Sequence, residues 1–169
     1  MTELRDVFTK DGTPTGRTWK QGTKRTNGDY YLHAVVILRT PDGRYPLAQR
    51  MPDDDYFPGM WDVTGGGVRA GETPAQGGAR EVREELGVSV DPDKLVFLNR
   101  YRLDYEDGTG SHVFMFGAVF NSPGVYSYDP KEVNAVIEVR FDEFIKTVMY
   151  NKDAAFARAL TEFEDSFRQ

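Results

Sequence analysis

Cysteine is absent from the 169 residues of this chain, and several classes of protein are excluded with it. The chain cannot be a disulfide-stapled scaffold, cannot hold an iron–sulfur cluster or a cysteine-based zinc site, and has no thiol nucleophile. No apolar run approaches the ~20 residues that a membrane-spanning helix needs. The first residues also lack the apolar segment of a signal peptide, so a soluble cytoplasmic protein is the default expectation.

Basic residues are fewer than acidic ones. The chain has 21 Lys and Arg and 27 Asp and Glu, which gives a formal net charge of −6. Binding to a nucleic-acid backbone needs a basic surface, so we expect no nucleic-acid polymer as a partner. A small polyanionic substrate remains open, because a divalent cation can bridge acidic side chains to phosphates. The simpler interpretation is that mild acidity keeps the protein soluble.

The length suits one domain, since domains run to roughly 100–200 residues, and we expect residues 1–169 to form a single one. Glycine and proline turns separate apolar segments that are typical of strands. These segments are 4–8, 15–19, 31–38, 45–50, 95–103, 112–120 and 135–140. Segment 31–38 is apolar on both faces, which indicates a central strand covered on both sides.

The best-signalled helix covers residues 73–86. Thr73 is a natural N-cap, Pro74 suits the first helical position, and Gln76 completes a capping box. Gly87 can adopt the left-handed conformation that ends a helix. The apolar stripe expected to be buried consists of Ala75, Ala79, Val82 and Leu86.

Two more helices are expected near the C-terminal end. The first covers 141–150, and the second begins at an Asn151 cap. The apolar stripe of the second helix consists of Phe156, Ala159, Leu160, Phe163 and Phe167. Strands on both sides of a capped helix, followed by further helices, predict an α/β fold whose layers surround a mixed sheet.

Three glutamates of the capped helix, Glu81, Glu84 and Glu85, stand at i, i+3 and i+4. This spacing puts them on one face, although like charges so placed destabilise a helix. A hard divalent cation such as Mg²⁺ takes oxygen ligands and would relieve the repulsion. The alternative is a solvated acidic face that pairs with Arg80 and Arg83.

A run of three glycines, 65–67, stands just before the helix. Glycines let backbone groups approach phosphates or metals closely, and they adopt positive φ at no steric cost. The order of strand end, glycine loop, capped helix and carboxylate row is typical of a phosphate and metal site. It is neither a Walker A motif nor a GxGxxG motif.

Segment 66–88 resembles the Nudix box, the signature of a family that hydrolyses nucleoside diphosphates linked to another moiety. The pattern is Gly, five residues, Glu, seven residues, Arg-Glu, an aliphatic residue, any residue, Glu-Glu, any residue, Gly and an aliphatic residue. Every fixed position is met, by Gly66, Glu72, Arg80, Glu81, Val82, Glu84, Glu85, Gly87 and Val88.

The resemblance implies the Nudix fold, an α/β/α sandwich around a mixed sheet, and the activity of a metal-dependent pyrophosphohydrolase. The implied ligands of Mg²⁺ or Mn²⁺ are Glu81, Glu84 and Glu85, with the Gly66 carbonyl nearby. Arg80 would orient these acids, and Glu72 would pair with Arg80 or approach the metal. Members of the family often dimerise, so a homodimer is one expectation, although no interface pattern stands out in the residues.

The general base that takes the proton of the attacking water is left open among Glu72, Glu84, Glu85 and Glu132. Glu132 lies outside the box, where many members of the family carry a late acid that binds metal or acts as the base. Its segment must fold over the box helix for this role, because a base must come within hydrogen-bond reach of its water. The alternative is an ordinary turn residue.

Two further residues are candidates for substrate binding. Arg50 can bind a phosphate through its guanidinium fork, and the alternative is a salt bridge with the Asp run 53–55. Trp61 can stack on a base, and the alternative is packing in the core. His33, on the expected central strand, is interpreted as a hydrogen-bonded core histidine rather than a catalytic one.

Residues 5–145 show a softer resemblance to the Nudix branch related to isopentenyl diphosphate isomerase. Those isomerases use a catalytic cysteine, and this chain has Val63-Thr64-Gly65 where they carry it near the strand end. Isomerase activity is therefore a disfavoured alternative. A non-catalytic sensor of nucleotide or sugar diphosphates is the other, and the intact row of acids argues against it. The expected partner is a small-molecule diphosphate of open identity.

Overall fold

The computed structural model describes residues 3–54, 57–148 and 154–168. The first half of the chain forms β1 (Leu4–Phe8), β2 (Pro14–Lys20), β3 (Tyr30–Arg39), β4 (Arg44–Arg50), β5 (Trp61–Asp62), β6 (Thr64–Gly67) and α1 (Pro74–Leu86). The second half forms the short 3-10 helix η1 (Pro92–Lys94), β7 (Val96–Asp104), β8 (Gly110–Val119), β9 (Val133–Arg140), α2 (Phe141–Thr147) and α3 (Ala154–Asp165). No helix in these ranges is long and apolar enough to cross a membrane.

The strands form two sheets. The larger has the order β2–β1–β3–β8–β7, and β6 also pairs with β3. β3 and β8 run parallel, whereas β3 pairs with β1 and β6 in the antiparallel sense. The smaller sheet has the order β5–β4–β9. The larger sheet is therefore mixed, as the sequence predicted.

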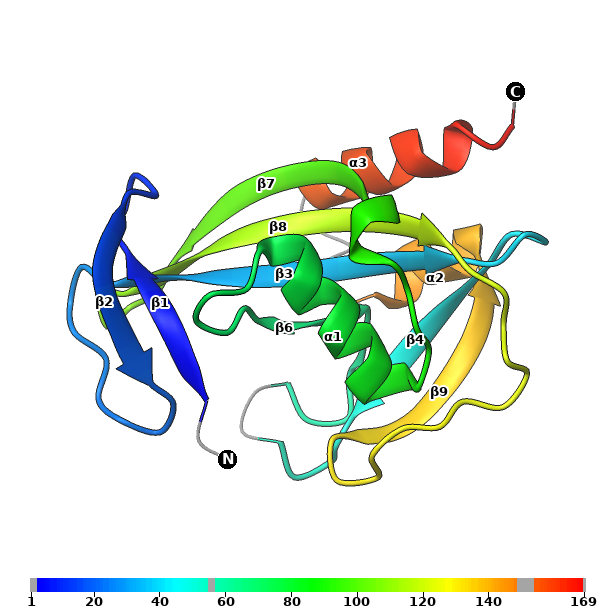
Figure 1. The fold of residues 1–169 in the computed structure, drawn as a ribbon. Coiled ribbons are helices and arrows are strands. Elements are labelled where there is room, and N and C mark those ends of the chain that lie inside the picture. The colour runs from blue at the N-terminus through cyan, green and yellow to red at the C-terminus, as the bar shows by residue number, and fades with distance from the viewer. Residues whose placement is uncertain (1–2, 55–56, 149–153, 169) are drawn as a thin grey trace.

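The central strand β3 is covered on both sides. Successive side chains of a strand point to opposite faces, so its residues divide between two cores. Ala34 and Val36 pack in the core that contains Val82 of α1. Val35 and Ile37 belong to the core that α2 and α3 complete. Figure 1 shows α1 in front of β3, with α2 partly hidden behind the strands, and the expected α/β/α sandwich is confirmed.

The helix α1 begins and ends as predicted, but its buried stripe differs from the prediction. Thr73 and Gln76 form both hydrogen bonds of the capping box, and Gly87 has a φ of 68°. Ala75 and Ala79 are only half-buried, whereas the adjacent Gly77 and Gly78 are buried. These two glycines, rather than the alanines, therefore face the sheet.

The reason is the close approach of α1 to the sheet. A Cβ on Gly78 would lie 2.8 Å from Cγ2 of Val36 on β3, and one on Gly77 would lie 3.1 Å from Cγ2 of Val68. A glycine inside a helix costs roughly 1 kcal/mol relative to alanine. Here that cost accompanies a helix packed directly against β3, which brings the glutamates of α1 close to the strands.

The C-terminal helices agree with the sequence in part. Phe156, Ala159, Leu160 and Phe163 of α3 are buried, as expected. Phe167 lies beyond the end of α3 and is 39% exposed, so its place in the buried stripe was wrong. The helix α2 ends at Thr147, and the predicted residues 149–150 and the Asn151 cap lie outside the described residues.

Candidate active site

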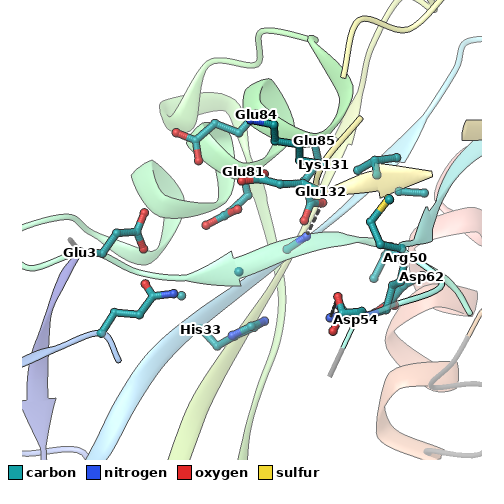
Figure 2. Close-up of a pocket in the computed structure, with 18 of the residues that line it drawn as sticks. Glu3, His33, Arg50, Asp54, Asp62, Glu81, Glu84, Glu85, Lys131 and Glu132 are labelled. Carbon is teal, nitrogen blue, oxygen red and sulfur yellow. Dashed lines mark hydrogen bonds and ion pairs between the residues drawn. The ribbon is translucent and has the colours of Figure 1, made fainter. Parts of the chain in front are cut away.

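A cavity of about 900 Å³ lies between α1 and the strands β3, β4 and β6. Most of the side chains that line it are charged. The charged ones are Glu3, Arg5, Arg25, Arg50, Asp53, Asp54, Asp62, Arg69, Glu81, Glu84, Glu85, Lys131 and Glu132. In Figure 2 the glutamates of α1 lie above His33, Glu3 lies at one end, and Arg50, Asp54 and Asp62 lie at the other. The cavity therefore extends from Glu3 past the glutamates of α1 to Arg50, Asp54 and Asp62.

The glycine run forms one wall of this cavity, but it is a strand and not the loop that the sequence predicted. Residues 65–67 belong to β6, which pairs with β3 from Val36↔Thr64 to His33↔Gly67. None of the three glycines has a positive φ. Their role is to leave room, because a Cβ on Gly66 would lie 2.4 Å from the carboxyl carbon of Glu81.

Arg80 organises the acids of the box. Its Nη1 donates to Oε1 of Glu81 at 2.7 Å and to Oε2 of Glu84 at 2.9 Å. Its Nε donates to Oε1 of Glu72 at 2.9 Å, and its Nη2 donates to the carbonyl of Gly67 at 2.9 Å. The guanidinium is buried, which lowers its pKa, but the bonds to Glu72 and Glu81 outweigh burial and raise the pKa above its ordinary value. One planar fork thus fixes three carboxylates and β6.

Glu72 is occupied by these bonds. In addition to its bonds from Arg80, Oε2 of Glu72 accepts a hydrogen bond from the backbone N–H of Arg69 at 3.0 Å. Burial raises the pKa of Glu72, but the hydrogen bonds from Arg80 and Arg69 lower it more strongly, so the net shift is downward. Glu72 is also not among the residues that line the cavity. The structure therefore brings Glu72 to Arg80, one of its two expected positions, and leaves it poorly placed as a base.

Glu81 and Glu85 place their carboxyl groups in a poorly solvated position. Burial raises the pKa of Glu85 well above its ordinary value, the charge of Glu81 adds to the rise, and the N–H of Gly65 opposes it from 3.3 Å. Burial also raises the pKa of Glu81, although Arg80 acts in the opposite direction. Two carboxylates whose charge is disfavoured in this way would be stabilised by a cation between them.

The donor set has the chemistry of a site for a hard divalent cation, but the side chains are not arranged as one. Glu81, Glu84, Glu85 and Gly66 supply carboxylate and carbonyl oxygens to the same cavity, and these are the ligands that Mg²⁺ prefers. Within the described residues, no three Asp, Glu or His side chains converge to hold an ion. Glu81 and Glu84 face Arg80 instead, so binding a cation would require them to turn.

At the opposite end of the cavity, Arg50 forms an ion pair with Asp54 at 2.7 Å. This is the alternative that the sequence offered, although Arg50 also lines the cavity. Trp61 packs against the apolar core and is not among the lining residues, so its predicted stacking on a substrate is not supported. Lys131 and Glu132 line the cavity, which gives the segment of Glu132 the position over the box helix that a base requires.

Two lining residues have positions that the sequence analysis missed or misjudged. Asp62 is buried, its Oδ1 accepts from the N–H of Val63 at 2.8 Å, and burial raises its pKa to about 7. His33 lines the cavity and was wrongly expected in the core; desolvation and the charges of Arg5 and Arg50 lower its pKa to about 4. Of the two, only Asp62 could have been noticed in the sequence, as an acid three residues before the glycine run.

Comparisons with known proteins agree with this architecture. A family model described as the NUDIX domain matches residues 29–161. Nudix hydrolase 3 of Arabidopsis thaliana is 28% identical over 162 residues, which cover 89% of this chain and 21% of that protein. The nucleoside triphosphatase NudI of Escherichia fergusonii is 37% identical over 91 residues, which cover 52% of this chain and 64% of that protein. This chain thus spans less than two thirds of either relative.

Solved structures resemble most of the fold. The MutT protein from Methanosarcina mazei has a TM-score of 0.65 at 18% identity, covering 87% of this chain and 100% of that one. A C. elegans Ap4A hydrolase in a binary complex has a TM-score of 0.60 at 22% identity, covering 82% of this chain and 98% of that one. With the complete box, the capped helix α1 and the family model over most of its length, this chain belongs to the Nudix family.

Proposed function

We propose that this chain is a metal-dependent pyrophosphohydrolase that cleaves a diphosphate linkage in a nucleoside diphosphate-linked or related small organic molecule. The observation that carries the proposal is the cavity beside β6, which Glu81, Glu84 and Glu85 all line, with Arg80 hydrogen-bonded to Glu81 and Glu84. The names of relatives and neighbours, among them a nucleoside triphosphatase and an Ap4A hydrolase, support the same class of reaction.

The cation would be held by the Gly66 carbonyl, Glu81, Glu84 and Glu85. When bound, Mg²⁺ or Mn²⁺ would neutralise charge on the diphosphate and lower the pKa of a water. The chain itself would supply positioning, because Arg80 fixes the carboxylates of Glu81 and Glu84 relative to β6.

We assign the general base to Glu132. It lines the cavity, whereas Glu72 does not and has its oxygens engaged by Arg80 and Arg69. Glu84 and Glu85 remain the alternatives for the base, although each is also a proposed metal ligand. The base would accept a proton from a water in the cavity, which requires approach within about 2.6–3.2 Å.

Two other functions are less well supported. Isomerisation of isopentenyl diphosphate would need a substitute for the missing cysteine, and Thr64, near that position, is buried in β6. A non-catalytic sensor would have no use for the carboxylate row that Arg80 holds in place. The charged cavity itself would suit a sensor as well as an enzyme, so turnover has to be measured.

The experiment that tests the proposal is a panel of small diphosphates incubated with the protein and Mg²⁺ or Mn²⁺. The panel should contain nucleoside triphosphates, nucleotide sugars, dinucleoside polyphosphates, ADP-ribose and isopentenyl diphosphate. We expect metal-dependent release of phosphate, pyrophosphate or a mononucleotide from at least one class. Tight binding without turnover across the panel would instead support the sensor.

A further inference from the structure

One end of the cavity is formed by the N-terminal hairpin and the loop that follows it. Arg5 of β1 and Arg25 of the β2–β3 loop line this end. We call these two residues the cationic end of the cavity. Neither belongs to the Nudix box, and neither has a role in the carboxylate network that Arg80 organises.

Arg5 brings a poorly compensated charge into the cavity. Its guanidinium lies against β6, where a Cβ on Gly67 would be 2.0 Å from Cζ of Arg5. Within the described residues its ion pair is with Glu3, at a distance of 4.0 Å. Glu3 is hydrogen-bonded more closely to Arg69, whose Nε donates to it at 2.7 Å. Arg5 therefore shares a carboxylate that another arginine already holds.

Hydrogen bonding around Arg5 is also incomplete. Among the residues that the structure describes, the buried Nε of Arg5 has no hydrogen-bond partner, and neither has the buried hydroxyl of Tyr31, which contacts the same Trp19 ring. Burial lowers the pKa of Arg5, and the charges of Arg25 and Arg80 lower it further, while Glu3 and Glu81 act against this. Buried polar groups in folded proteins are normally satisfied, so a guanidinium whose one ion pair within the described residues is long and whose Nε lacks a hydrogen bond would be stabilised by an anion in the cavity.

Arg25 is held by aromatic rings instead of by a carboxylate. Its Cζ lies 5.4 Å from the ring centre of Trp19, 5.5 Å from that of Tyr31 and 5.7 Å from that of Tyr105. In the part of the chain that the structure describes, no carboxylate forms an ion pair with it. Ring faces attract a cation but leave its N–H donors free for a ligand. The Cζ of Arg5 lies 5.9 Å from the centre of the same Trp19 ring, so both arginines pack against Trp19.

We propose that Arg5 and Arg25 bind the terminal phosphate of the substrate, and that the substrate is therefore an organic di- or triphosphate with a free phosphate end, such as a nucleoside triphosphate. This inference rests on the proposed function. Arg5 is close enough to Glu81 for their charges to interact, so the cationic end adjoins the carboxylate row. If the inner phosphates of the substrate were held at the carboxylate row, its terminal phosphate would reach the two arginines.

The free end matters because of its charge. A terminal phosphate monoester carries about −1.5 to −2 at neutral pH, whereas a phosphate linked on both sides carries one negative charge. Guanidinium groups bind phosphate oxygens through paired hydrogen bonds. Two arginines without firm counterions therefore favour the doubly charged end over a capped diphosphate, such as a nucleotide sugar or a dinucleoside polyphosphate.

The first test measures binding without catalysis. Inorganic tripolyphosphate is titrated calorimetrically into metal-free protein in EDTA at low ionic strength. The variants are Arg5→Gln, Arg25→Gln and the control Arg44→Gln, which removes a charge at an exposed position outside the cavity. We expect Arg5→Gln and Arg25→Gln to weaken binding at least about tenfold, or about 1.4 kcal/mol, and Arg44→Gln to leave it unchanged. Equal affinity in all four proteins, or no binding to wild type, would overturn the proposal.

The second test uses turnover. We expect wild type to have a higher kcat/KM for a nucleoside triphosphate than for a dinucleoside polyphosphate, and Arg5→Gln to lose at least tenfold on the triphosphate alone. An equal loss on both substrates, or a preference of wild type for the capped compound, would refute the assignment. If no compound is hydrolysed, the proposed function fails, and the tripolyphosphate titration still decides whether the cationic end binds a terminal phosphate.

Discussion

Arg80 and Glu81 are consecutive residues of α1, yet their side chains meet, with Nη1 of Arg80 2.7 Å from Oε1 of Glu81. The same nitrogen donates to Glu84 one turn further on, at 2.9 Å. Like-charged carboxylates at this spacing repel each other. A buried arginine thus holds together acids that would otherwise separate, in the wall of the cavity where we place the chemistry.

Replacing Arg80 with lysine tests whether the positive charge of Arg80 is enough or the geometry of its guanidinium is also needed. Arg80→Lys keeps the positive charge but loses the fork that joins Glu72, Glu84 and the Gly67 carbonyl, so we expect turnover to fall by about 100-fold. Unfolding free energy should fall by about 1–3 kcal/mol, because buried acceptors lose their donors. Arg83→Lys, on the exposed side of the same helix, is the matched control and should change neither. Wild-type turnover in Arg80→Lys would show that the fork is dispensable.

Gly78 should resist substitution even though it lies in a helix. Helix propensity alone predicts that Gly78→Ala stabilises the protein by about 1 kcal/mol. The added Cβ would lie 2.8 Å from Val36 of β3, so we expect a net loss of about 1–3 kcal/mol from overpacking. Urea denaturation measures the difference. A stabilised Gly78→Ala would mean that α1 can move away from β3 at little cost.

Asp62 should make the metal-free protein less stable as pH rises. Its folded pKa is about 7, against about 3.9 in an unfolded chain, so the folded state keeps a proton that the unfolded state has released. The free energy of unfolding should therefore fall between pH 4 and pH 7. Glu85, whose pKa is also raised, contributes with the same sign.

The substitution Asp62→Asn should flatten that dependence. At pH 8 in EDTA we expect the variant to be more stable than wild type by a few kcal/mol, since one pKa unit corresponds to about 1.4 kcal/mol. Denaturation at several pH values measures this, with the exposed Glu162→Gln as a control that keeps the wild-type slope. An Asp62→Asn protein that keeps the full wild-type slope would contradict the burial of a protonated carboxyl.

Glu132 should contribute to catalysis more than to stability. It lies in an exposed segment, where substitutions usually change stability by under ~0.5 kcal/mol. As the base, Glu132→Gln should lower turnover by roughly 10²–10⁴-fold and remove the acidic limb of the pH–rate profile. An unchanged rate and profile would transfer the role to Glu84 or Glu85. The neighbouring Lys131→Gln serves as a control for the segment.

The local parts of this structure could be predicted from the sequence. The helix α1 has its cap, first proline and terminal glycine within one continuous segment, and its glutamates share a face by spacing alone. Such features depend on neighbours in sequence, which is why pattern reasoning reached them.

The rest depended on contacts between distant segments. The glycine run is a strand only because it pairs with β3, about 30 residues earlier. Its glycines allow neighbouring side chains to approach the strand closely, and none of them adopts a positive φ. Arg5 reaches the cavity because β1 pairs with β2 and meets β3. The spacing of residues along a single strand or helix does not predict these contacts between distant segments. It also does not predict that His33 lines the cavity.

The most direct test of the whole account is the dependence of hydrolysis on Mg²⁺ in wild type, Glu84→Gln and Glu85→Gln. Each substitution keeps the size of the side chain and removes one carboxylate from the proposed cation site. We expect folded variants whose turnover on the best substrate of the panel falls at least 100-fold at limiting Mg²⁺, because the lost ligand removes charge stabilisation in the transition state. Wild-type turnover and an unchanged Mg²⁺ requirement in both variants would contradict the assignment of these glutamates to the metal.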